Sequence, residues 1–170
     1  MYTTQELQQI KAQLKEHINQ IIDLRFDQMI AHLGDASETT ENVIECERTY
    51  LLNTELAIFK GKKIIRVLFT NGQTIDTPKW KSAVSAIMQD CISDPSRYEK
   101  LMALRGKIQG RDRVLLGSES GTMHRPLKIA ENLYLETHYD SETLLRILTA
   151  RILSAVSYDY SGIRITVRNG

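Results

Sequence analysis

The stretch "KIIRVLFTNGQTIDT" (Lys63–Thr77) contains a run of apolar and β-branched residues that stops at Asn71-Gly72, after which a second, shorter run begins. β-Branched residues favour strands, and Asn-Gly favours the tight turn of a hairpin because both residues accept left-handed backbone angles. We therefore predict an antiparallel hairpin of residues 63–70 with residues 73–77. This hairpin makes a β-sheet part of the fold.

Three helices are expected after the hairpin. Pro78 can occupy the first turn of a helix over residues 78–92, and Pro95 starts a second helix that ends at Gly106. The third helix, about sixteen residues long, is capped by Asp140 or Ser141 and has the strongest apolar stripe of the domain. The apolar positions of that helix are Leu144, Leu145, Leu148, Ile152, Leu153 and Val156.

The remaining segments favour strands. Residues 113–118 form a short strand, most of residues 127–139 form a long one, and residues 163–168 alternate apolar with polar side chains. The order of elements is therefore a helix, a linker and then β-β-α-α-β-β-α-β. This order is typical of an α+β fold with helices on one face of a small, mainly antiparallel sheet. Parallel pairing across the last β-α-β remains open.

The N-terminal residues form a separate segment. From residue 4 to residue 33 apolar side chains recur at helical spacing and occupy a and d positions of successive heptads. A helix of this length extends beyond what a small domain can cover, so we expect it to pair with a second copy as a coiled coil. The alternative is that a broader stripe, including Ile18 and Phe26, packs on the C-terminal domain. The expected dimerisation residues are Leu7, Ile10, Leu14, Ile21 and Leu24.

The distribution of charge also divides the chain into an N-terminal and a C-terminal part. An acidic, aperiodic stretch begins at Gly34, and we assign residues 34–57 to a linker and residues 58–170 to the α+β domain, after a dimerisation helix over residues 1–33. Residues 1–60 contain five Lys and Arg against ten Asp and Glu, a net charge of −5, and the rest of the chain carries +6. Opposite charges indicate two modules with different partners, or two modules that attract each other.

Several functional classes find no support in the sequence. The N-terminus lacks the basic and apolar regions of a signal peptide, and no apolar run reaches about 18 residues, so we expect a cytoplasmic protein with no membrane contact. Cys46 and Cys91 lie in unlike contexts, which favours reduced thiols and no zinc site. Because P-loop, GxSxG, HExxH and GxGxxG motifs are missing, we expect no cofactor, no metal and no catalytic residue.

The strongest functional signal is "LRGKIQGRDRVLL" (Leu104–Leu116), which holds four cationic side chains and two glycines. The planar fork of arginine matches phosphate, and glycines let an anion approach the backbone. A hairpin over residues 115–122 would bring two more cations to the same edge. The alternative is a solvated loop whose ion-pair partners are Asp112 and Glu119. The expected nucleic-acid contacts are Arg105, Lys107, Arg111, Arg113, Arg125 and Lys128.

Two histidines and one tryptophan are weaker candidates. His124 and His138 could flank a phosphate as acid and base, although ordinary surface histidines are far more common than such pairs. Trp80 lies between Lys79 and Lys81 and could contact a ligand. The role that we expect for it is an anchor between helix and sheet.

Three segments carry a resemblance to a known type of domain. They are "FKGKKIIRVLF" (residues 59–69), the cationic segment 104–116 and "NLYLETHYDSETLL" (residues 132–145). Over residues 58–170 the chain resembles a small, uncharacterised bacterial domain that occurs alone or attached to predicted restriction, defence or other DNA-directed proteins. Ile64 stands where that domain usually has proline. The resemblance implies a nucleic-acid context and no known catalytic residue.

These patterns together predict a non-enzymatic module that binds DNA, RNA or another polyanion as a homodimer. The alternative is a protein-protein interaction or regulatory protein that does not bind nucleic acid, in which the acidic part masks the basic part or both parts dock a protein partner. A steep loss of nucleic-acid binding with added salt belongs only to the first interpretation.

Overall fold

The computed structural model describes residues 8, 11, 15, 22 and 47–169, and the fold given below is that of residues 47–169. The chain divides into two units, Met1–Ile44 and Glu45–Gly170. The four described residues of the first unit are helical and exposed. The remainder of the predicted helix over residues 4–33 lies outside the described residues. So do all five expected dimerisation residues, Leu7, Ile10, Leu14, Ile21 and Leu24.

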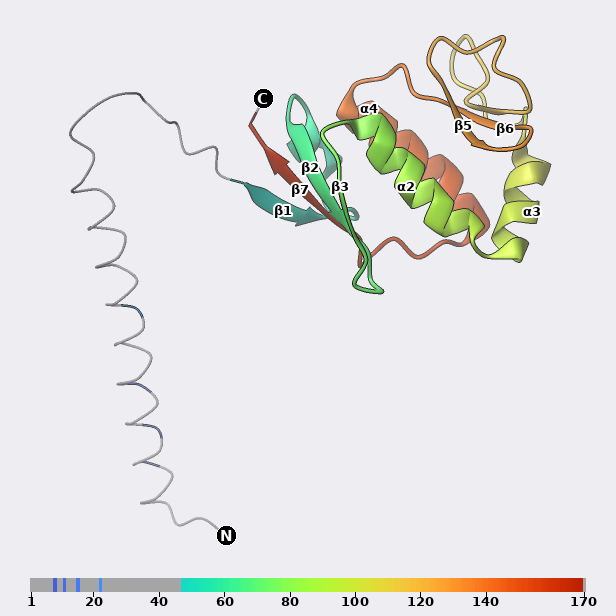
Figure 1. Cartoon of the computed structure of the whole chain (residues 1–170). Helices are drawn as coiled ribbons and strands as arrows, with labels where there is room; N and C mark the ends of the chain where they lie inside the picture. The colour runs from blue at the N-terminus through green and yellow to red at the C-terminus, as the bar shows by residue number, and fades with distance from the viewer. Residues whose placement is uncertain (1–7, 9–10, 12–14, 16–21, 23–46, 170) are drawn as a thin grey trace. The chain divides into compact units, whose positions relative to one another are not determined.

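A four-stranded antiparallel sheet joins the two ends of the described domain (Figure 1). Its strand order is β1-β7-β2-β3. β1 lies within residues 34–57, which we expected to be a linker. This strand forms because its backbone pairs with β7 at the other end of the domain, which the local sequence does not reveal. The strands are β1 (Arg48–Leu51), β2 (Lys63–Leu68), β3 (Thr74–Asp76) and β7 (Arg164–Arg168).

The predicted hairpin is confirmed. β2 and β3 are antiparallel neighbours, with Val67 opposite Ile75. Gly72 adopts a φ of 85°, which glycine accepts without strain. The N–H of Phe69 donates to the carbonyl of Gln73 at 2.9 Å, which closes the turn.

A second, three-stranded sheet is present where we expected one sheet in all. It consists of β4 (Leu116–Gly117), β5 (Pro126–Ala130) and β6 (Leu133–Glu136) in the order β4-β6-β5. The single long strand that we expected over residues 127–139 is wrong. The chain turns between β5 and β6 at Asn132, whose φ is 53°, a left-handed conformation that asparagine tolerates better than most residues. The expected hairpin over residues 115–122 is also wrong, because β6 lies between β4 and β5.

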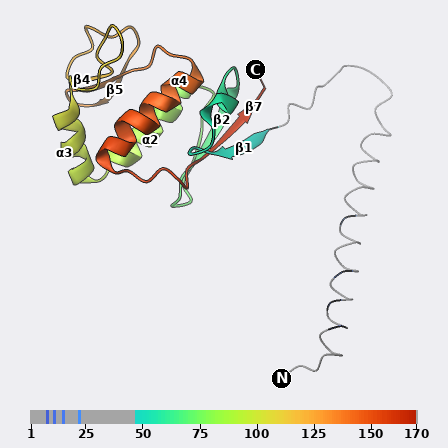
Figure 2. The ribbon, with the colours of Figure 1, turned by 180° about the vertical axis from the view of Figure 1, so that it is seen from behind.

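Two long helical segments lie side by side between the sheets in both views (Figures 1 and 2). One is α2 (Trp80–Ile92). The other begins as α4 (Ser141–Arg146), continues as the π-helix η2 (Ile147–Leu153) and ends as the 3-10 turn η3 (Ser154–Val156). A short turn, η1 (Leu56–Phe59), precedes β2, and α3 (Pro95–Leu104) follows α2.

The predicted helix starts hold for two of three helices; the start at Pro78 is wrong, because α2 begins at Trp80. The Asp140 side chain accepts the N–H of Thr143 at 3.0 Å and thereby caps α4. At α3 the Asp94 side chain accepts the N–H of Arg97 at 3.1 Å, and Pro95 takes the first helical position. Both caps place a carboxylate at the N-terminus of a helix, where the backbone dipole favours negative charge.

Helix α2 connects the two sheets through polar as well as apolar contacts. The indole N–H of Trp80 donates to the Lys62 carbonyl at 3.0 Å, and its ring meets that of Phe59 edge to face. On the other side, Lys81 and Gln89 donate to the carbonyls of Pro126 and Ile129 at 2.8 and 2.6 Å, which covers the free edge of β5. The role of Trp80 as an anchor between helix and sheet is confirmed.

The described residues thus confirm an α+β fold with antiparallel sheets. One continuous core fills the space between the layers. Its fully buried members come from α2, from the helix formed by α4, η2 and η3, and from both sheets. Across residues 47–169 and the four described residues before them, the structure has no helix with the length and apolar character that a membrane span requires.

A close contact at Gly162 provides a test of this packing. A Cβ atom at this position would lie 2.1 Å from Cγ2 of Thr70. We expect Gly162→Ala to lower the free energy of unfolding by about 1–3 kcal/mol, as overpacking does. Thr70→Ala removes the opposing methyl group, so the double variant should recover most of that loss in urea denaturation. Equal destabilisation of the single and double variants would show that this contact is not the cause.

Candidate functional site

The residues between β4 and α4 are organised around the carboxylate of Glu136, the last residue of β6. This side chain has no exposed surface. Its oxygens accept the backbone N–H groups of His124 at 2.5 Å, His138 at 2.8 Å and Arg125 at 3.0 Å. One carboxylate therefore holds the end of β6 and the loop before β5 together.

The alternation of β6 places Glu136 in this position. Leu133 and Leu135 enter the core, so Glu136 points to the opposite face of the three-stranded sheet. The loop over residues 118–125 crosses that face, and its Met123 lies against Gly117. A Cβ atom at Gly117 would come within 3.2 Å of the Met123 side chain. The absence of a side chain at Gly117 thus lets the loop reach Glu136.

The N–H groups around Glu136 stabilise its charged form. Burial alone favours the neutral acid, but the hydrogen bonds from the backbone of His124, His138 and Arg125 outweigh burial, so the pKa of Glu136 lies below its usual value. A guanidinium nitrogen of Arg113 lies 3.9 Å from the same carboxylate and is its ion-pair partner. The negative charge of Glu136 is thus neutralised within the fold.

Two of the six predicted contact residues have structural roles. Arg113 is largely buried beside Glu136, with 23% of its side chain exposed. Arg105 donates to the carbonyls of Met102 at 2.8 Å and Asn132 at 3.0 Å, and so ties the end of α3 to the turn between β5 and β6. Because these two guanidinium groups already have partners, they are less available to an anion.

The other four predicted contact residues are exposed, and their side chains form no ion pair with any residue that the structure describes. Two of them border Glu136. The backbone N–H of Arg125 donates to its carboxylate. Lys128 lies on the same face of the sheet as Glu136, because Pro126 pairs with Glu136 in the β5–β6 register and Lys128 is two residues further along β5. The four residues are Lys107, Arg111, Arg125 and Lys128.

The loop that carries Arg111 also lies near Glu136, the last residue of β6. Gln109 and Val114 form a β-bridge, so residues 110–113 are the tip of a tight hairpin. The hydroxyl of Tyr139 lies 3.3 Å from where a Cβ atom of Gly110 would be, which places this tip next to the end of β6. Convergence of the cationic side chains of the two loops stays a prediction, and the hairpin over residues 115–122 on which we based it is wrong.

The structure brings His124 and His138 together at this edge. Their rings stack with centroids 5.5 Å apart and an interplanar angle of 14°. Both side chains are exposed, and both backbone N–H groups donate to Glu136. Sequence spacing alone could not place them side by side. We refer to Arg111, Arg113, His124, Arg125 and His138 as the Glu136 rim.

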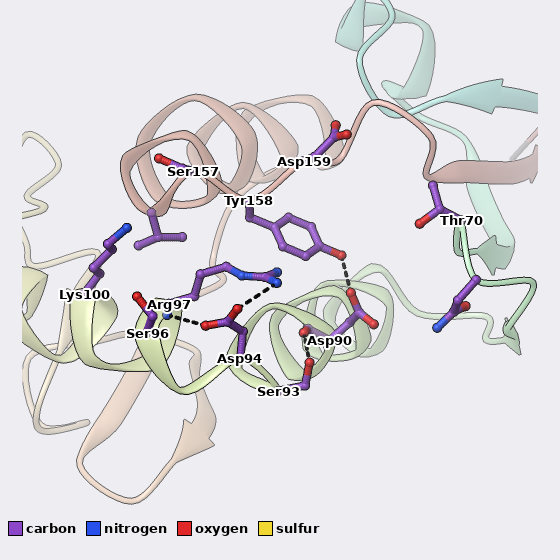
Figure 3. A pocket seen from close by; sticks show the side chains of 12 residues that line it. Thr70, Asp90, Ser93, Asp94, Ser96, Arg97, Lys100, Ser157, Tyr158 and Asp159 are labelled. Atoms are coloured by element: carbon purple, nitrogen blue, oxygen red, sulfur yellow. Dashed lines mark hydrogen bonds and ion pairs between the residues drawn. The ribbon is translucent and has the colours of Figure 1, made fainter.

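A separate polar pocket, of about 650 Å³, was not predicted from the sequence (Figure 3). Three segments far apart in the chain form it: the β2–β3 turn, the α2–α3 junction and the residues that follow η3. The sequence indicated two of these segments separately, through the Asn71-Gly72 turn and the helix start at Pro95, but not that they lie together. The lining residues are Thr70, Asn71, Asp90, Ser93, Asp94, Ser96, Arg97, Lys100, Val156, Ser157, Tyr158 and Asp159.

The floor of this pocket is a polar network (Figure 3). The Tyr158 hydroxyl donates to the Asp90 carboxylate, and the Arg97 guanidinium lies 5.1 Å from the centre of the Tyr158 ring. Arg97 also pairs with Asp94 at 3.3 Å. Burial and the hydrogen bond to Asp90 raise the pKa of Tyr158, so its hydroxyl remains protonated and donates at neutral pH. Burial likewise raises the pKa of the neighbouring Cys91 to about 11, which leaves an unreactive thiol.

Among the described residues, no group of three or more His, Cys, Asp or Glu side chains has the arrangement of a metal site. Comparison of the chain with protein-family models, with curated proteins and with solved structures gave no match.

Replacement of Glu136 tests its role in holding these loops. Glu136→Gln keeps the size of the side chain but removes the charge, so we expect a loss of about 1.5–3 kcal/mol in the free energy of unfolding at pH 7. The folded pKa lies below the unfolded value of about 4.3, so this stabilisation is fully present above that value and is lost as the pH falls through the folded pKa.

The difference between wild type and Glu136→Gln should therefore shrink below about pH 4 in urea denaturation. Glu131→Gln, at an exposed position in the β5–β6 turn, is the matched control and should change stability little. A difference that stays constant across this pH range would contradict a charged Glu136 in the folded state.

Proposed function

We propose that the protein binds nucleic acid, or a similar polyanion, at the Glu136 rim and does not act as an enzyme. The observation that carries this proposal is the position of Glu136. Its carboxylate draws the loop before β5 to the end of β6, beside the tip of residues 110–113, while backbone N–H groups and Arg113 neutralise its own charge. Arg111 and Arg125 are exposed, and neither side chain forms an ion pair with a residue that the structure describes.

The chemistry of these side chains suits phosphate. Each exposed guanidinium offers paired N–H donors, and His124 and His138 add ring donors beside them. Lys128 on β5 and Lys107 before the tip are further exposed cations. No aromatic side chain suitable for base stacking was found in the cationic segment of the sequence, so contacts to phosphates rather than to bases account best for the binding.

The proposal includes a homodimer. We propose that residues 4–33 form a long helix that pairs with a second copy as a coiled coil, as the heptad pattern of Leu7, Ile10, Leu14, Ile21 and Leu24 indicates. Two linked domains would engage one polyanion with a higher effective concentration than two separate ones. The resemblance to domains attached to DNA-directed proteins supports this proposal, and the context that we propose is bacterial defence or restriction.

Charge removal at the rim tests the binding surface. We expect Arg111→Ala/Arg125→Ala to weaken duplex DNA or RNA binding in gel shifts and to reduce the slope of log K against log salt by about 2, since each lost phosphate contact removes about 0.9. The matched control is Lys63→Ala/Arg164→Ala, which removes two exposed charges from the four-stranded sheet and should leave that slope unchanged.

Equal effects of the rim and control variants would contradict a specific surface. If the wild type binds no nucleic acid at low salt, the proposal is wrong, and the alternative of a protein that binds a protein partner and no nucleic acid replaces it.

A single substitution tests the dimer. We expect Leu14→Asp to convert the protein to a monomer in sedimentation equilibrium, because it places a charge in the apolar seam. Gln8→Asp makes the same change in charge at an exposed position and should leave the dimer intact. A wild-type protein that sediments as a monomer would contradict this part of the proposal.

A further inference from the structure

We propose that the polar pocket between the β2–β3 turn, the α2–α3 junction and residues 156–159 binds a small phosphate monoester that carries hydroxyl groups, the chemistry shared by mononucleotides and sugar phosphates. This site lies on different residues from the Glu136 rim and does not depend on the proposed function.

The lining of the pocket selects a hydrophilic ligand. Of its twelve residues only Val156 has an aliphatic side chain, and the rest offer hydroxyl, amide, carboxylate, ammonium or guanidinium groups. An apolar ligand would leave these groups without partners, which is costly. The volume of about 650 Å³ lies within the range of known small-ligand sites.

One end of the pocket suits a phosphate. Lys100 lies there with Ser96 and Ser157 (Figure 3). The Lys100 ammonium makes no ion pair with any described residue, because the nearby Asp94 pairs with Arg97. One ammonium group and two hydroxyls supply the charge and the hydrogen-bond donors that a phosphate group requires.

The other end suits hydroxyl groups. Asp90 and Asp159 line it together with Thr70 (Figure 3). Asp90 accepts the Tyr158 hydroxyl, and Asp159 accepts the N–H of Ser161 at 2.9 Å. A carboxylate offers about four lone-pair positions, so each still has room for a donor from the ligand. Neighbouring hydroxyls of a sugar are donors of the right kind.

The balance of charge limits the ligand further. The pocket contains three carboxylates, from Asp90, Asp94 and Asp159, against the two cations Arg97 and Lys100. With Arg97 and Asp94 paired, one cation remains for the ligand, and the two remaining carboxylates repel additional negative charge. A monophosphate is therefore favoured over a triphosphate or a nucleic-acid strand.

The floor of the pocket is held in place by contacts among its own side chains. Tyr158 is fixed between Asp90 and Arg97, and Arg97 is fixed by Asp94. Little ordering is needed on binding, which favours affinity. A ligand that touches all three segments would also stabilise the fold, since it binds the folded state alone.

The direct experiment is calorimetry on the full chain with AMP, ribose 5-phosphate, adenosine, inorganic phosphate and ATP as probes. We expect AMP, ribose 5-phosphate or both to bind with 1:1 stoichiometry and to raise the melting temperature. Adenosine, inorganic phosphate and ATP should each bind at least about tenfold more weakly, because each lacks one feature that the pocket recognises or adds a charge that it repels. Binding of AMP alone identifies a nucleotide, and equal binding of ribose 5-phosphate identifies the sugar phosphate as sufficient.

Two variants tie the binding to the pocket. Lys100→Gln and Asp159→Asn should each lower the affinity for the binding probe about tenfold or more. Their controls, Lys60→Gln and Asp112→Asn, lie outside the pocket and should have no effect. All four positions are exposed, so none of these changes should prevent folding.

Three results would overturn the proposal: no binding of either phosphate ester, unchanged affinity in Lys100→Gln and Asp159→Asn, or tighter binding of ATP than of AMP. None of them bears on nucleic-acid binding at the Glu136 rim, since Lys100→Gln leaves the rim intact. The two proposals therefore succeed or fail separately.

Discussion

The buried carboxylate of Glu136 is the constraint on which the candidate binding surface depends. A buried charge is costly unless hydrogen bonds and an opposite charge offset it. Three backbone N–H groups and Arg113 provide that compensation, and in doing so they fix the positions of His124, Arg125 and His138. The same interaction that makes Glu136 tolerable in the interior thus arranges the exposed side chains around it.

The structure divides the cations of the sequence into two kinds. Arg105 and Arg113 are bound to carbonyls or to Glu136, and helix α2 uses Lys81 to cover the edge of β5. Arg111 and Arg125 are exposed and form no ion pair within the part of the chain that the structure describes. The polar pocket differs in that its carboxylates outnumber its cations. The rim therefore suits an extended polyanion, and the pocket suits a small ligand with a single phosphate.

Local signals in the sequence predicted the three helices of the α+β domain, the Asn71-Gly72 hairpin and the cap at Asp140, because each depends on neighbouring residues. Pairing between distant segments was not visible. β1 forms only against β7, so its local sequence is like that of a linker, and the left-handed turn at Asn132 divides an apparently continuous strand into β5 and β6. The cationic residues were predicted from composition. Two of them bind within the fold, to Glu136 and to the carbonyl of Asn132, and these partners lie elsewhere in the sequence. The pocket was missed for the same reason, since it joins three distant segments.

The most direct measurement of the central claim is amide chemical-shift mapping of the full chain during titration with a short nucleic-acid duplex. The account predicts that the largest changes fall on residues 110–113, 124–125 and 138, and that the strands β1, β2, β3 and β7 change little. Changes concentrated on the four-stranded sheet, or changes that remain undiminished at high salt, would contradict the assignment of the Glu136 rim as the binding surface.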